Sequence, residues 1–542
     1  MFFNSINKGK VFNFIMPLAL LAVSASCQTQ KEVAETETQQ KPNILYIMSD
    51  DHTTQAFGIY GSRLAALNPT PVLDALGQEG MVFEQAFCNN SICTPSRASV
   101  MTGQYSQANG VLDLDGHLPP EKQYLPMEMK KLGYQTAIIG KWHLVDEPAA
   151  FDYYEVLPVQ GKYFNPDFRK KDEGAWPNNL VTYQGHSTDI ITDRTLDWLK
   201  NRRDKDQPFF LMHHYKAPHD DFEFAPRYAS YLEDTEIPEP ASLYGQPQFG
   251  SEATKGKNDS LSHRIGTSVS DRHPYRSYTK QYDIKSSDQK EATHLAYQEY
   301  LKRYLRCVKG VDDNLGRLFA YLKENGLWEN TIIIYTGDQG FMLGEHDYMD
   351  KRWMYDESMR MPFIVHYPGM VKPGSRTQAL INNTDFAPTM LAMAGGQVPD
   401  YMQGNSFLPV LKGEKTESTQ TATYYRYWMH LMHHDVPAHF GIRTKEYKLI
   451  FYYGLPSDMR VMGKPSMPWQ KESYLIEQTP AAWEFYDLSK DPEEVHNRYG
   501  DPAYQAIIAD LKTQLKEKRE ALNETDEKYP HIQKVIAAHW DD

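Results

Sequence analysis

Five short runs of apolar residues constrain the fold of this 542-residue chain more than any other feature. Within each run the apolar residues are continuous rather than alternating with polar ones, which is typical of strands buried on both faces of a parallel sheet. Helical stretches separate the runs, for example at residues 189–201 and 296–325. Alternation of buried strands and helices indicates a layered α/β fold. The predicted strands lie at residues 43–48, 136–139, 209–212, 331–335 and 362–366.

Charged side chains follow four of these runs, at the point where each predicted strand ends. In open α/β sheets, ligands bind beyond the carboxyl ends of the strands. We therefore expect the four groups to meet in one crevice. They are Ser49-Asp50-Asp51, Gly140-Lys141-Trp142-His143, Lys216-Ala217-Pro218-His219 and Gly337-Asp338-Gln339-Gly340.

Three carboxylates in this set, Asp50, Asp51 and Asp338, would repel one another unless a cation lay between them. Oxygen ligands favour a hard ion such as Ca²⁺ or Mg²⁺, and Gln339 can add an amide oxygen. Two acidic residues after a strand can instead cap a helix. The stretch around Cys93 favours the metal site.

Residues 93–103 read Cys-Thr-Pro-Ser-Arg-Ala-Ser-Val-Met-Thr-Gly. Thr94 suits an N-cap and Pro95 suits the first position of a helix, so a helix is predicted to start here. The positive end of a helix favours an anion at Cys93, and Arg97 on the first turn can reach back to the same atom. The alternative is a buried, inert thiol at Cys93.

This Cys-x-Pro-x-Arg run with its closing Thr102-Gly103 resembles the signature of the type I sulfatases, and three further motifs follow in that family's order. The resemblance covers residues 41–540. It implies an alkaline-phosphatase-like α/β fold, with a mostly parallel sheet between helices and a smaller C-terminal α+β subdomain. It also implies that a maturase oxidises Cys93 to formylglycine, whose hydrated aldehyde is the nucleophile.

The resemblance assigns a role to each motif residue. One hydroxyl of the hydrated aldehyde, ionised by the metal and Arg97, attacks sulfur, while Lys141 and Lys351 neutralise the sulfate oxygens. His219, with Lys351, is suited to protonating the leaving alcohol. His143 then takes the proton of the second hydroxyl and sulfate is expelled. A serine would not suffice, because its sulfate ester would have no internal way to break.

The implied metal is a single Ca²⁺ rather than Mg²⁺. The family more often has Asn than Gln at the position of Gln339. Lys141 and His143 lie two residues apart, so an extended backbone would project both toward the site and Trp142 away from it. His213 and His214 match no motif and are predicted to be packing residues. The implied metal ligands are Asp50, Asp51, Asp338, Gln339 and an oxygen on residue 93.

The N-terminus has the pattern of a bacterial lipoprotein signal. Lys8 and Lys10 precede an apolar run at residues 11–23 that is too short for an ordinary transmembrane helix. Small residues then precede Cys27, although Ser24 stands where Leu is usual, so we expect a signal peptide at residues 1–27 and lipidation of Cys27. A plain secretory signal is the alternative. Residues 28–40 are expected to be a disordered tether, and the protein is expected to be exported and lipid-anchored in the cell envelope, periplasmic or at the cell surface.

Changes in composition divide the remaining chain. Residues 41–410 are the predicted catalytic domain. Within it, residues 236–293 are rich in Ser, Lys, Asp, Gly and Pro and are interpreted as a surface insertion, either a lid or a solvated loop. Residues 411–542 are the predicted C-terminal subdomain, with antiparallel strands near 423–430, 444–446 and 483–488. A helix is expected at 502–522, with Ile507, Leu511 and Leu515 on one face.

The net charge of −14 argues against nucleic acid or an anionic membrane as a partner, so membrane contact is expected only through the lipid anchor. A sulfated substrate is also an anion. Its affinity must therefore come from a local cluster of cations, which salt screens from charges more than about 10 Å away. Cys88 and Cys307 are compatible with one disulfide or with two buried thiols, and the sequence does not decide between them.

Residues 348–362 and 483–497 most resemble bacterial glycan sulfatases of the N-acetylglucosamine-6-sulfatase and heparan sulfatase type. The implied reaction is removal of 6-O-sulfate from a terminal N-acetylglucosamine of a glycosaminoglycan. If the loop around Lys351 turns, Asp350 and Arg352 suit paired sugar hydroxyls. His430, with the histidines at 433 and 434, is a further candidate for substrate binding.

Three alternatives stay open at this stage. The first is a carbohydrate sulfatase acting on 2-O-sulfated uronate. The second is a non-catalytic lipoprotein that binds sulfated glycans. The third is a phosphoesterase of the same superfamily, although those enzymes generally use two metals and a Ser or Thr nucleophile.

Overall fold

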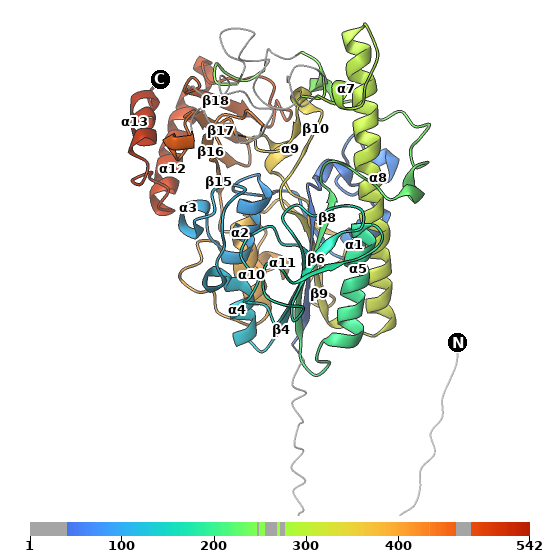
Figure 1. The fold of residues 1–542 in the computed structure, drawn as a ribbon. Coiled ribbons are helices and arrows are strands. Elements are labelled where there is room, and N and C mark those ends of the chain that lie inside the picture. The colour runs from blue at the N-terminus through green and yellow to red at the C-terminus, as the bar shows by residue number, and fades with distance from the viewer. Residues whose placement is uncertain (1–40, 246–248, 255–267, 271–276, 433, 462–477) are drawn as a thin grey trace, which may run out of the picture. The chain divides into compact units, whose positions relative to one another are not determined.

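The computed structural model describes residues 41–245, 249–254, 268–270, 277–432, 434–461 and 478–542 (Figure 1). Within it, Lys41–Asp542 forms one compact unit. The predicted signal peptide, the tether, the lipid site at Cys27 and His433 all lie outside the described residues. Among the residues described, none of the helices combines the length and the apolar character needed to cross a membrane.

A ten-stranded sheet forms the centre of this unit, in the order β13-β2-β12-β9-β1-β8-β4-β5-β6-β7 (Figure 1). The neighbours β9, β1, β8 and β4 run parallel, which confirms the predicted α/β fold with a mostly parallel sheet. In chain order the strands are β1 (Asn43–Asp50), β2 (Met81–Phe83), β4 (Gln135–Lys141), β5 (Tyr153–Leu157), β6 (Asp167–Lys170), β7 (Leu180–Thr182), β8 (Phe209–Pro218), β9 (Thr331–Gly337), β12 (Phe363–His366) and β13 (Ser375–Thr377).

The central strand β1 shows why the apolar runs are continuous. All eight of its residues are buried. Ile44 and Tyr46 pack into the core on one face of the sheet, and Leu45 and Ile47 into the core on the other. A strand covered on both faces needs apolar residues at successive positions, because successive side chains point to opposite faces.

Helices cover both faces of the sheet (Figure 1). One layer contains α2 (Cys93–Thr102), α4 (Tyr124–Lys131) and α10 (Phe386–Met393). The other contains α1 (Pro71–Glu79), α5 (Ser187–Asp197), which continues as η4 (Trp198–Arg202), and the long α8 (Gln289–Glu324). The predicted helices at 189–201 and 296–325 correspond to α5 with η4 and to α8. The latter starts earlier than predicted, because the Asp288 side chain caps it by accepting the Glu291 N–H.

Short elements complete the catalytic part. They are β3 (Ala86–Phe87), α3 (Ser106–Asn109), α7 (Tyr278–Gln281), β10 (Met342–Leu343), β11 (Met349–Asp350), α9 (Asp356–Met359), β14 (Ile381–Asn382), α11 (Leu408–Leu411) and single turns of 3-10 helix between them.

A separate four-stranded antiparallel sheet lies toward the C-terminus (Figure 1). It runs β15 (Ala422–Tyr427), β16 (His439–Thr444), β17 (Tyr447–Tyr452) and β18 (Ala482–Asp487), followed by α12 (Gln505–Ala521) and α13 (Pro530–His539). The predicted small sheet with a helix is therefore confirmed. Residues 444–446 lie at the hairpin between β16 and β17, and Ile508 rather than Ile507 joins Leu511 and Leu515 in the core.

Two expectations about the catalytic part were wrong. The strand β12 pairs antiparallel with β9, not parallel. The segment between β9 and β12 does not cross over the sheet. The chain therefore re-enters the sheet at the end where β9 finishes, and β12 must run in the opposite direction to β9. The described part of the 236–293 insertion is also not simply a surface loop, because Leu243, Val269 and Tyr278 are buried. Hydroxyl groups of Ser268 and Ser270 donate to Asp347 and fix this segment beside the loop that follows β10.

The cysteine question left open by the sequence has an answer in this structure. Cys88, Cys93 and Cys307 are three buried free thiols. Burial raises the pKa of Cys307 to about 12 and holds the pKa of Cys88 well above its usual value. Both therefore behave as small apolar core residues.

Candidate functional site

The ends of β1, β4, β8 and β9 bring the four predicted groups together. Asp50 and Asp51 follow from β1, Lys141 ends β4, and the segment after β8 carries His219. Asp338 and Gln339 follow β9, which pairs with β1. All of these side chains are buried. The four groups that were expected to meet at the strand ends therefore lie together in one buried cluster.

Arg97 and Asp338 form a buried ion pair at its centre. Arg97 donates to Asp338 Oδ2 from Nε at 3.1 Å and from Nη2 at 2.9 Å, and to the Lys141 carbonyl from Nη1 at 2.8 Å. Burial alone would raise the pKa of Asp338, but the charges of Arg97, Lys141 and Lys351 hold it below its usual value. The guanidinium thus binds Asp338, and its charge also acts on the Cys93 thiol, whose pKa it lowers.

Cys93 opens α2, with Ile92 rather than Thr94 at the N-cap position. The predicted helix start is present, but the predicted cap is wrong, because Thr94 Oγ1 instead lies 3.4 Å from the Leu114 carbonyl. Burial raises the pKa of the Cys93 thiol to about 11, against the opposing charge of Lys351. An unmodified thiol here would be almost entirely protonated at neutral pH and a poor nucleophile.

Each carboxylate after β1 pairs with a lysine. Lys351 Nζ lies 2.6 Å and 2.7 Å from the two Asp51 oxygens. Lys141 donates to Asp50 and, at 2.6 Å, to Gln160 Oε1. Burial would lower the pKa of Lys351, but the neighbouring carboxylates raise it above its usual value, so this lysine stays charged.

The oxygen atoms around Asp50 and Asp51 fit a hard cation. In the described part of the chain, Asp50 Oδ1 and Gln339 Oε1 are buried and have no hydrogen-bond partner. Buried polar atoms without a partner are costly, and a cation would satisfy both. Donor atoms of Asp50, Asp51 and His219 lie within 4.8 Å of one another. Asp338 faces the same region, but its Oδ2 is taken by Arg97.

His219 is a neutral histidine with a defined tautomer. Its Nδ1 lies 2.7 Å from the Asp220 carbonyl oxygen, so Nδ1 carries the proton, and Nε2 lies 3.8 Å from Asp51 Oδ2. Burial and the charges of Lys351 and Lys141 lower the pKa of His219 to about 3. The ring therefore presents an unprotonated Nε2 to the site.

The backbone after β4 is not extended, because His143 has a φ of 57°. Its side chain nevertheless lies at the site, with Nδ1 3.4 Å from Thr94 Oγ1. The Trp142 side chain turns away as expected and donates from Nε1 to the Asp146 carbonyl at 2.7 Å. Burial, together with the charges of Lys141 and Arg97, holds the pKa of His143 well below its usual value. The ring is therefore neutral and can accept a proton.

The loop around Lys351 turns, since Asp350 and Arg352 have φ values of 75° and 92°. Arg352 Nε donates to Asp350 Oδ2 at 2.9 Å, and His434 Nδ1 lies 3.4 Å from the same oxygen. The C-terminal part of the chain thus reaches this loop through His434. His430 instead accepts the backbone N–H of Ala438 at Nδ1, at 3.1 Å.

The structure adds three residues that the sequence did not single out. Gln160 binds Lys141 from an irregular loop that carries no motif. Lys216 is buried in the segment that carries His219, and its Nζ lies 4.7 Å from the Tyr163 ring centre. Burial holds the pKa of Lys141 well below its usual value, and the charge of Lys216 lowers that pKa further. Asn383 donates to Ser96 at 2.9 Å and holds α2 in place.

The two histidines predicted to pack do so. His213 Nδ1 lies 2.7 Å from Thr195 Oγ1 on α5. His214 Nδ1 lies 3.1 Å from the Lys141 carbonyl and 3.4 Å from Arg97 Nη1, so this histidine borders the site.

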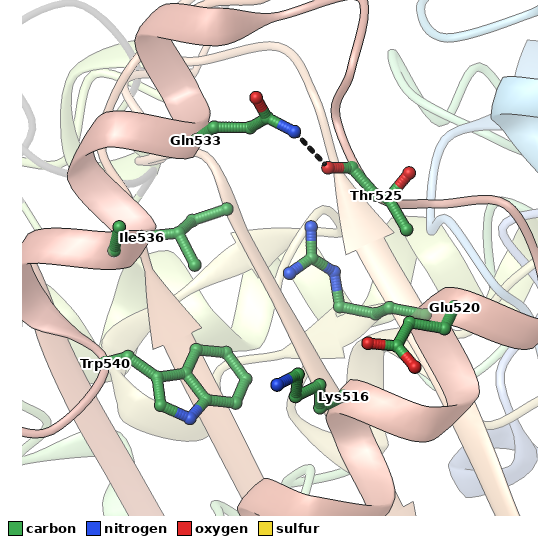
Figure 2. A pocket seen from close by; sticks show the side chains of 8 residues that line it. Lys516, Glu520, Thr525, Gln533, Ile536 and Trp540 are labelled. Atoms are coloured by element: carbon green, nitrogen blue, oxygen red, sulfur yellow. Dashed lines mark hydrogen bonds between the residues drawn. The ribbon is translucent and has the colours of Figure 1, made fainter.

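Two cavities differ in their relation to this site. One, of about 470 Å³, is partly lined by His143 and adjoins the site. The other, of about 370 Å³, lies between α12 and α13 and contains none of the predicted site residues (Figure 2). In it, Gln533 on α13 donates to the Thr525 carbonyl at 2.9 Å, opposite Lys516 and Glu520 on α12 (Figure 2).

Comparison with known families gives two matches. The family described as Sulfatase matches residues 42–396. The family described as N-sulphoglucosamine sulphohydrolase, C-terminal, matches residues 344–469 and 469–521.

Individual relatives agree with these matches. The N-acetylglucosamine-6-O-sulfatase of Bacteroides thetaiotaomicron is 36% identical, in an alignment that covers 96% of this chain and 93% of the relative. The human N-acetylglucosamine-6-sulfatase is 27% identical and matches 73% of this chain and 69% of its own length. A solved structure of a protein in complex with its substrate D-glucosamine-2-N,6-O-disulfate superimposes with a TM-score of 0.76 at 35% identity, covering 90% of this chain and 99% of that one.

Proposed function

We propose that this chain, which belongs to the sulfatase family and is a sulfuric ester hydrolase, removes the 6-O-sulfate of N-acetylglucosamine at the end of a glycosaminoglycan chain. The observation that carries this specificity is the cluster of Asp350, Arg352 and His434 beside Lys351. A carboxylate and a guanidinium side by side suit adjacent sugar hydroxyls. The relative that acts on N-acetylglucosamine 6-O-sulfate aligns over nearly the whole chain, which supports the same assignment here.

We also propose that Cys93 is converted to formylglycine, whose use is general in the family. The buried thiol, with its pKa near 11, is a poor nucleophile as it stands. Formylglycine at this position would supply a hydrated aldehyde as the nucleophile. Its place at the start of α2 puts it beside the helix N-terminus, where negative charge is stabilised.

A single Ca²⁺ is the proposed metal. The ligands would be Asp50, Asp51, Asp338 and Gln339, together with an oxygen on residue 93. The unpartnered oxygens of Asp50 and Gln339 support this set. When bound, the ion would stabilise negative charge on the nucleophile and on the sulfate.

Two lysines are placed to hold the sulfate group. An ammonium group has three donors. Lys351 uses two of them on Asp51, and Lys141 uses two on Asp50 and Gln160. Each lysine therefore keeps one N–H for the substrate: that of Lys141 for a sulfate oxygen, where it neutralises charge in the transition state, and that of Lys351 for the ester oxygen of the leaving alcohol.

Proton transfer is divided between Lys351 and two neutral histidines. Lys351 is the group that carries a transferable proton for the leaving alcohol, because the Nδ1 proton of His219 is engaged with the Asp220 carbonyl. Once Lys351 has protonated it, the leaving alcohol can donate a hydrogen bond to His219 Nε2. His143 is neutral and serves as the base that takes the second proton of the nucleophile.

The test of this proposal has two parts. Mass spectrometry of the peptide that contains residue 93 should find the aldehyde when the protein is made in a host with the maturase. Kinetics should then show faster desulfation of 6-sulfo-N-acetylglucosamine than of 2-sulfo-uronate disaccharides, with kcat/KM reduced in Arg352→Ala. Arg376→Ala, which removes an exposed arginine on β13, is the matched control. A preference for the 2-sulfate, or an unchanged Arg352→Ala enzyme, would contradict the assignment of the sugar site.

We further propose that the chain is exported and anchored by a lipid on Cys27. The basic residues, the short apolar run and the small residues before Cys27 support this. An anchored enzyme with a soluble catalytic unit would act on glycans outside the cytoplasm.

A further inference from the structure

The cavity of about 470 Å³ beside His143 is otherwise lined by residues that have no proposed role in the sulfate chemistry. Trp142, Val145, Val159 and Trp176 supply apolar walls, from the β4–β5 connection, the loop after β5 and the turn after β6. His143 completes one side. The cavity therefore opens directly beside the proposed base.

The loop that carries Val159 also touches the site. Its next residue, Gln160, accepts a hydrogen bond from Lys141 at 2.6 Å. On the opposite side, His143 lies against Thr94, the residue after the proposed nucleophile. An occupant of the cavity would thus lie next to His143 and to the segment that carries the proposed nucleophile.

Two exposed valines at this cavity have unusual backbone conformations. Val145 and Val159 are 41% and 65% exposed, and their φ values are 61° and 50°. A β-branched residue with positive φ is a conformational outlier, and such outliers tend to occur at ligand clamps. The fold therefore holds two apolar side chains toward solvent at the mouth of one cavity, where a ligand can cover them.

The aromatic wall is suited to a ring. Arg169 lies over Trp176 with its Cζ 4.5 Å from the ring centre, and its Nε donates to the Pro177 carbonyl at 3.0 Å. Trp176 also packs edge-on against Tyr154. These contacts fix the indole in place, and a fixed indole offers a flat apolar surface to the C–H face of a sugar.

The charges at the cavity disfavour an anion. Asp115 and Asp146 contribute two carboxylates, and Arg169 one guanidinium. His117 pairs with Asp146 at 3.0 Å. The lining thus has one more formal negative charge than positive charge, in a protein whose net charge is already −14. A uronate or a second sulfate would be repelled here, whereas an uncharged ring would not.

We infer that this cavity binds the sugar linked to the sulfated one, and that this neighbour is an uncharged hexose rather than a uronate. The inference rests on the proposed function, since it places a sulfated sugar in the adjoining site. It narrows the substrate to 6-sulfated N-acetylglucosamine carried on a neutral sugar.

The experiment compares three substrates at equal ionic strength: 6-sulfo-N-acetylglucosamine alone, linked to a neutral hexose, and linked to a hexuronate. We expect kcat/KM for the neutral disaccharide to exceed that for the monosaccharide by about tenfold, as one stacked ring provides. Trp176→Ala and Val159→Asp should remove this gain and leave the monosaccharide rate unchanged. Trp176→Phe should retain most of it. Leu295→Asp, which alters an exposed apolar residue on α8 outside the cavity, should behave as wild type.

Equal rates for all three substrates, or a preference for the hexuronate, would overturn the inference. If Trp176→Ala loses monosaccharide activity while Trp176→Phe keeps it, the indole supports the fold. The Val159→Asp variant then decides whether the cavity binds the second sugar. If wild type desulfates none of the three, the proposed function fails. Crystals soaked with the methyl glycoside of the neutral hexose then test the cavity alone: a sugar ring between Trp176 and Val159 supports the inference, and an empty cavity overturns it.

Discussion

At the residue scale, the site combines buried charge with strained backbone. Asp51, His143, Asp350 and Arg352 all have φ values between 57° and 92°. Residues without the freedom of glycine pay for this conformation, and such strain persists where the surrounding packing determines it. Here buried ion pairs hold Asp51, Asp350 and Arg352, and His143 lies against Thr94, so the side chains are positioned before a substrate arrives.

The first prediction concerns the nucleophile. Cys93→Ala should lower kcat by at least about 10⁴-fold, because the only group that can become the nucleophile is lost. The free energy of unfolding should change by no more than about 1 kcal/mol, since one sulfur atom is removed. Cys88→Ala is the matched control, because it removes a second buried thiol that has no role in the site. Turnover by the Cys93→Ala protein would refute the formylglycine assignment.

The second prediction concerns the metal. Chelation of Ca²⁺ should abolish activity and lower Tm, and added Ca²⁺ should restore both. At a free Ca²⁺ concentration 100 times Kd, binding contributes about 2.7 kcal/mol to stability. Asp50→Asn should lose this response. Asp312→Asn should keep it, because Asp312 is a buried carboxylate that accepts the N–H groups of Val72 and Leu73 at the start of α1.

Elemental analysis provides the independent check. One calcium per chain is expected in the active protein, and Asp50→Asn should contain much less. Two transition metals per chain, or active protein without any metal, would contradict the proposed site and favour a phosphoesterase-like arrangement.

At the element scale, a buried ion cluster joins the C-terminal sheet to the catalytic part. Asp356 at the start of α9 binds Arg443 of β16 at 2.7 Å and Lys448 of β17 at 2.8 Å. Lys448 also binds Glu494 at 2.6 Å, and Glu494 accepts the backbone N–H of Asp356. The loop that carries Lys351 and Arg352 leads directly into α9, so this cluster fixes the loop relative to His434.

The third prediction is that Asp356→Asn destabilises the protein by about 3 kcal/mol, because it leaves the buried guanidinium of Arg443 without its carboxylate and leaves Lys448 with Glu494 alone. Denaturant unfolding measures the change. Glu417→Gln is the control, since it breaks an exposed pair with Lys445 and should cost less than about 0.5 kcal/mol. Equal stabilities of the two variants would show that the cluster does not hold the sheet.

The same carboxylate gives a pH dependence. Burial would raise the pKa of Asp356, but Arg443 and Lys448 hold it well below its usual value. In the unfolded state the pKa of an aspartate is about 3.9, and in the folded state the pKa of Asp356 is lower. The stabilisation is therefore present at neutral pH and is lost as the pH falls below about 4. Wild type should therefore lose more stability between pH 6 and pH 3 than Asp356→Asn does.

Strand ends could be predicted from the sequence and loop paths could not. The residues after β1, β4, β8 and β9 met as expected, because parallel strands put their ends on one edge. Gln160 and His434 lie on irregular segments, and nothing in a local pattern shows which distant loop they contact. The direction of β12 was missed because a short apolar run contains no sign of its orientation.

Arg97 shows a different limit. Its position on α2 was correctly read from the motif, but its partner, Asp338, lies 241 residues away in the chain. A long side chain on a helix can reach several groups, and only the packed structure selects one of them. The sequence therefore identified the residue types of the site more fully than their pairings.

At the scale of the whole molecule, the fourth prediction concerns the N-terminus. In the native host, the wild-type protein should sediment with membranes, and Cys27→Ser should release it or leave it unprocessed, because no thiol is present for lipidation. Fractionation followed by immunoblotting measures this. Cys307→Ser, which changes a buried thiol in the catalytic part, should remain membrane-associated. A soluble wild-type protein would instead support the plain secretory signal.

The last prediction concerns the charge of the whole protein. The chain carries 71 acidic and 57 basic residues, while the cations of the site are gathered in one buried cluster. A monosaccharide sulfate experiences mainly this cluster, whereas a long polysulfated chain also experiences the net negative charge of the rest of the protein. Raising NaCl from about 50 to about 200 mM shortens the range of that repulsion. The ratio of kcat/KM for a long polysulfated glycan to that for the monosaccharide should therefore rise with salt. A ratio that falls with salt would mean that a local track of basic residues guides the chain, and that the enzyme is built for long polyanions rather than for terminal sugars.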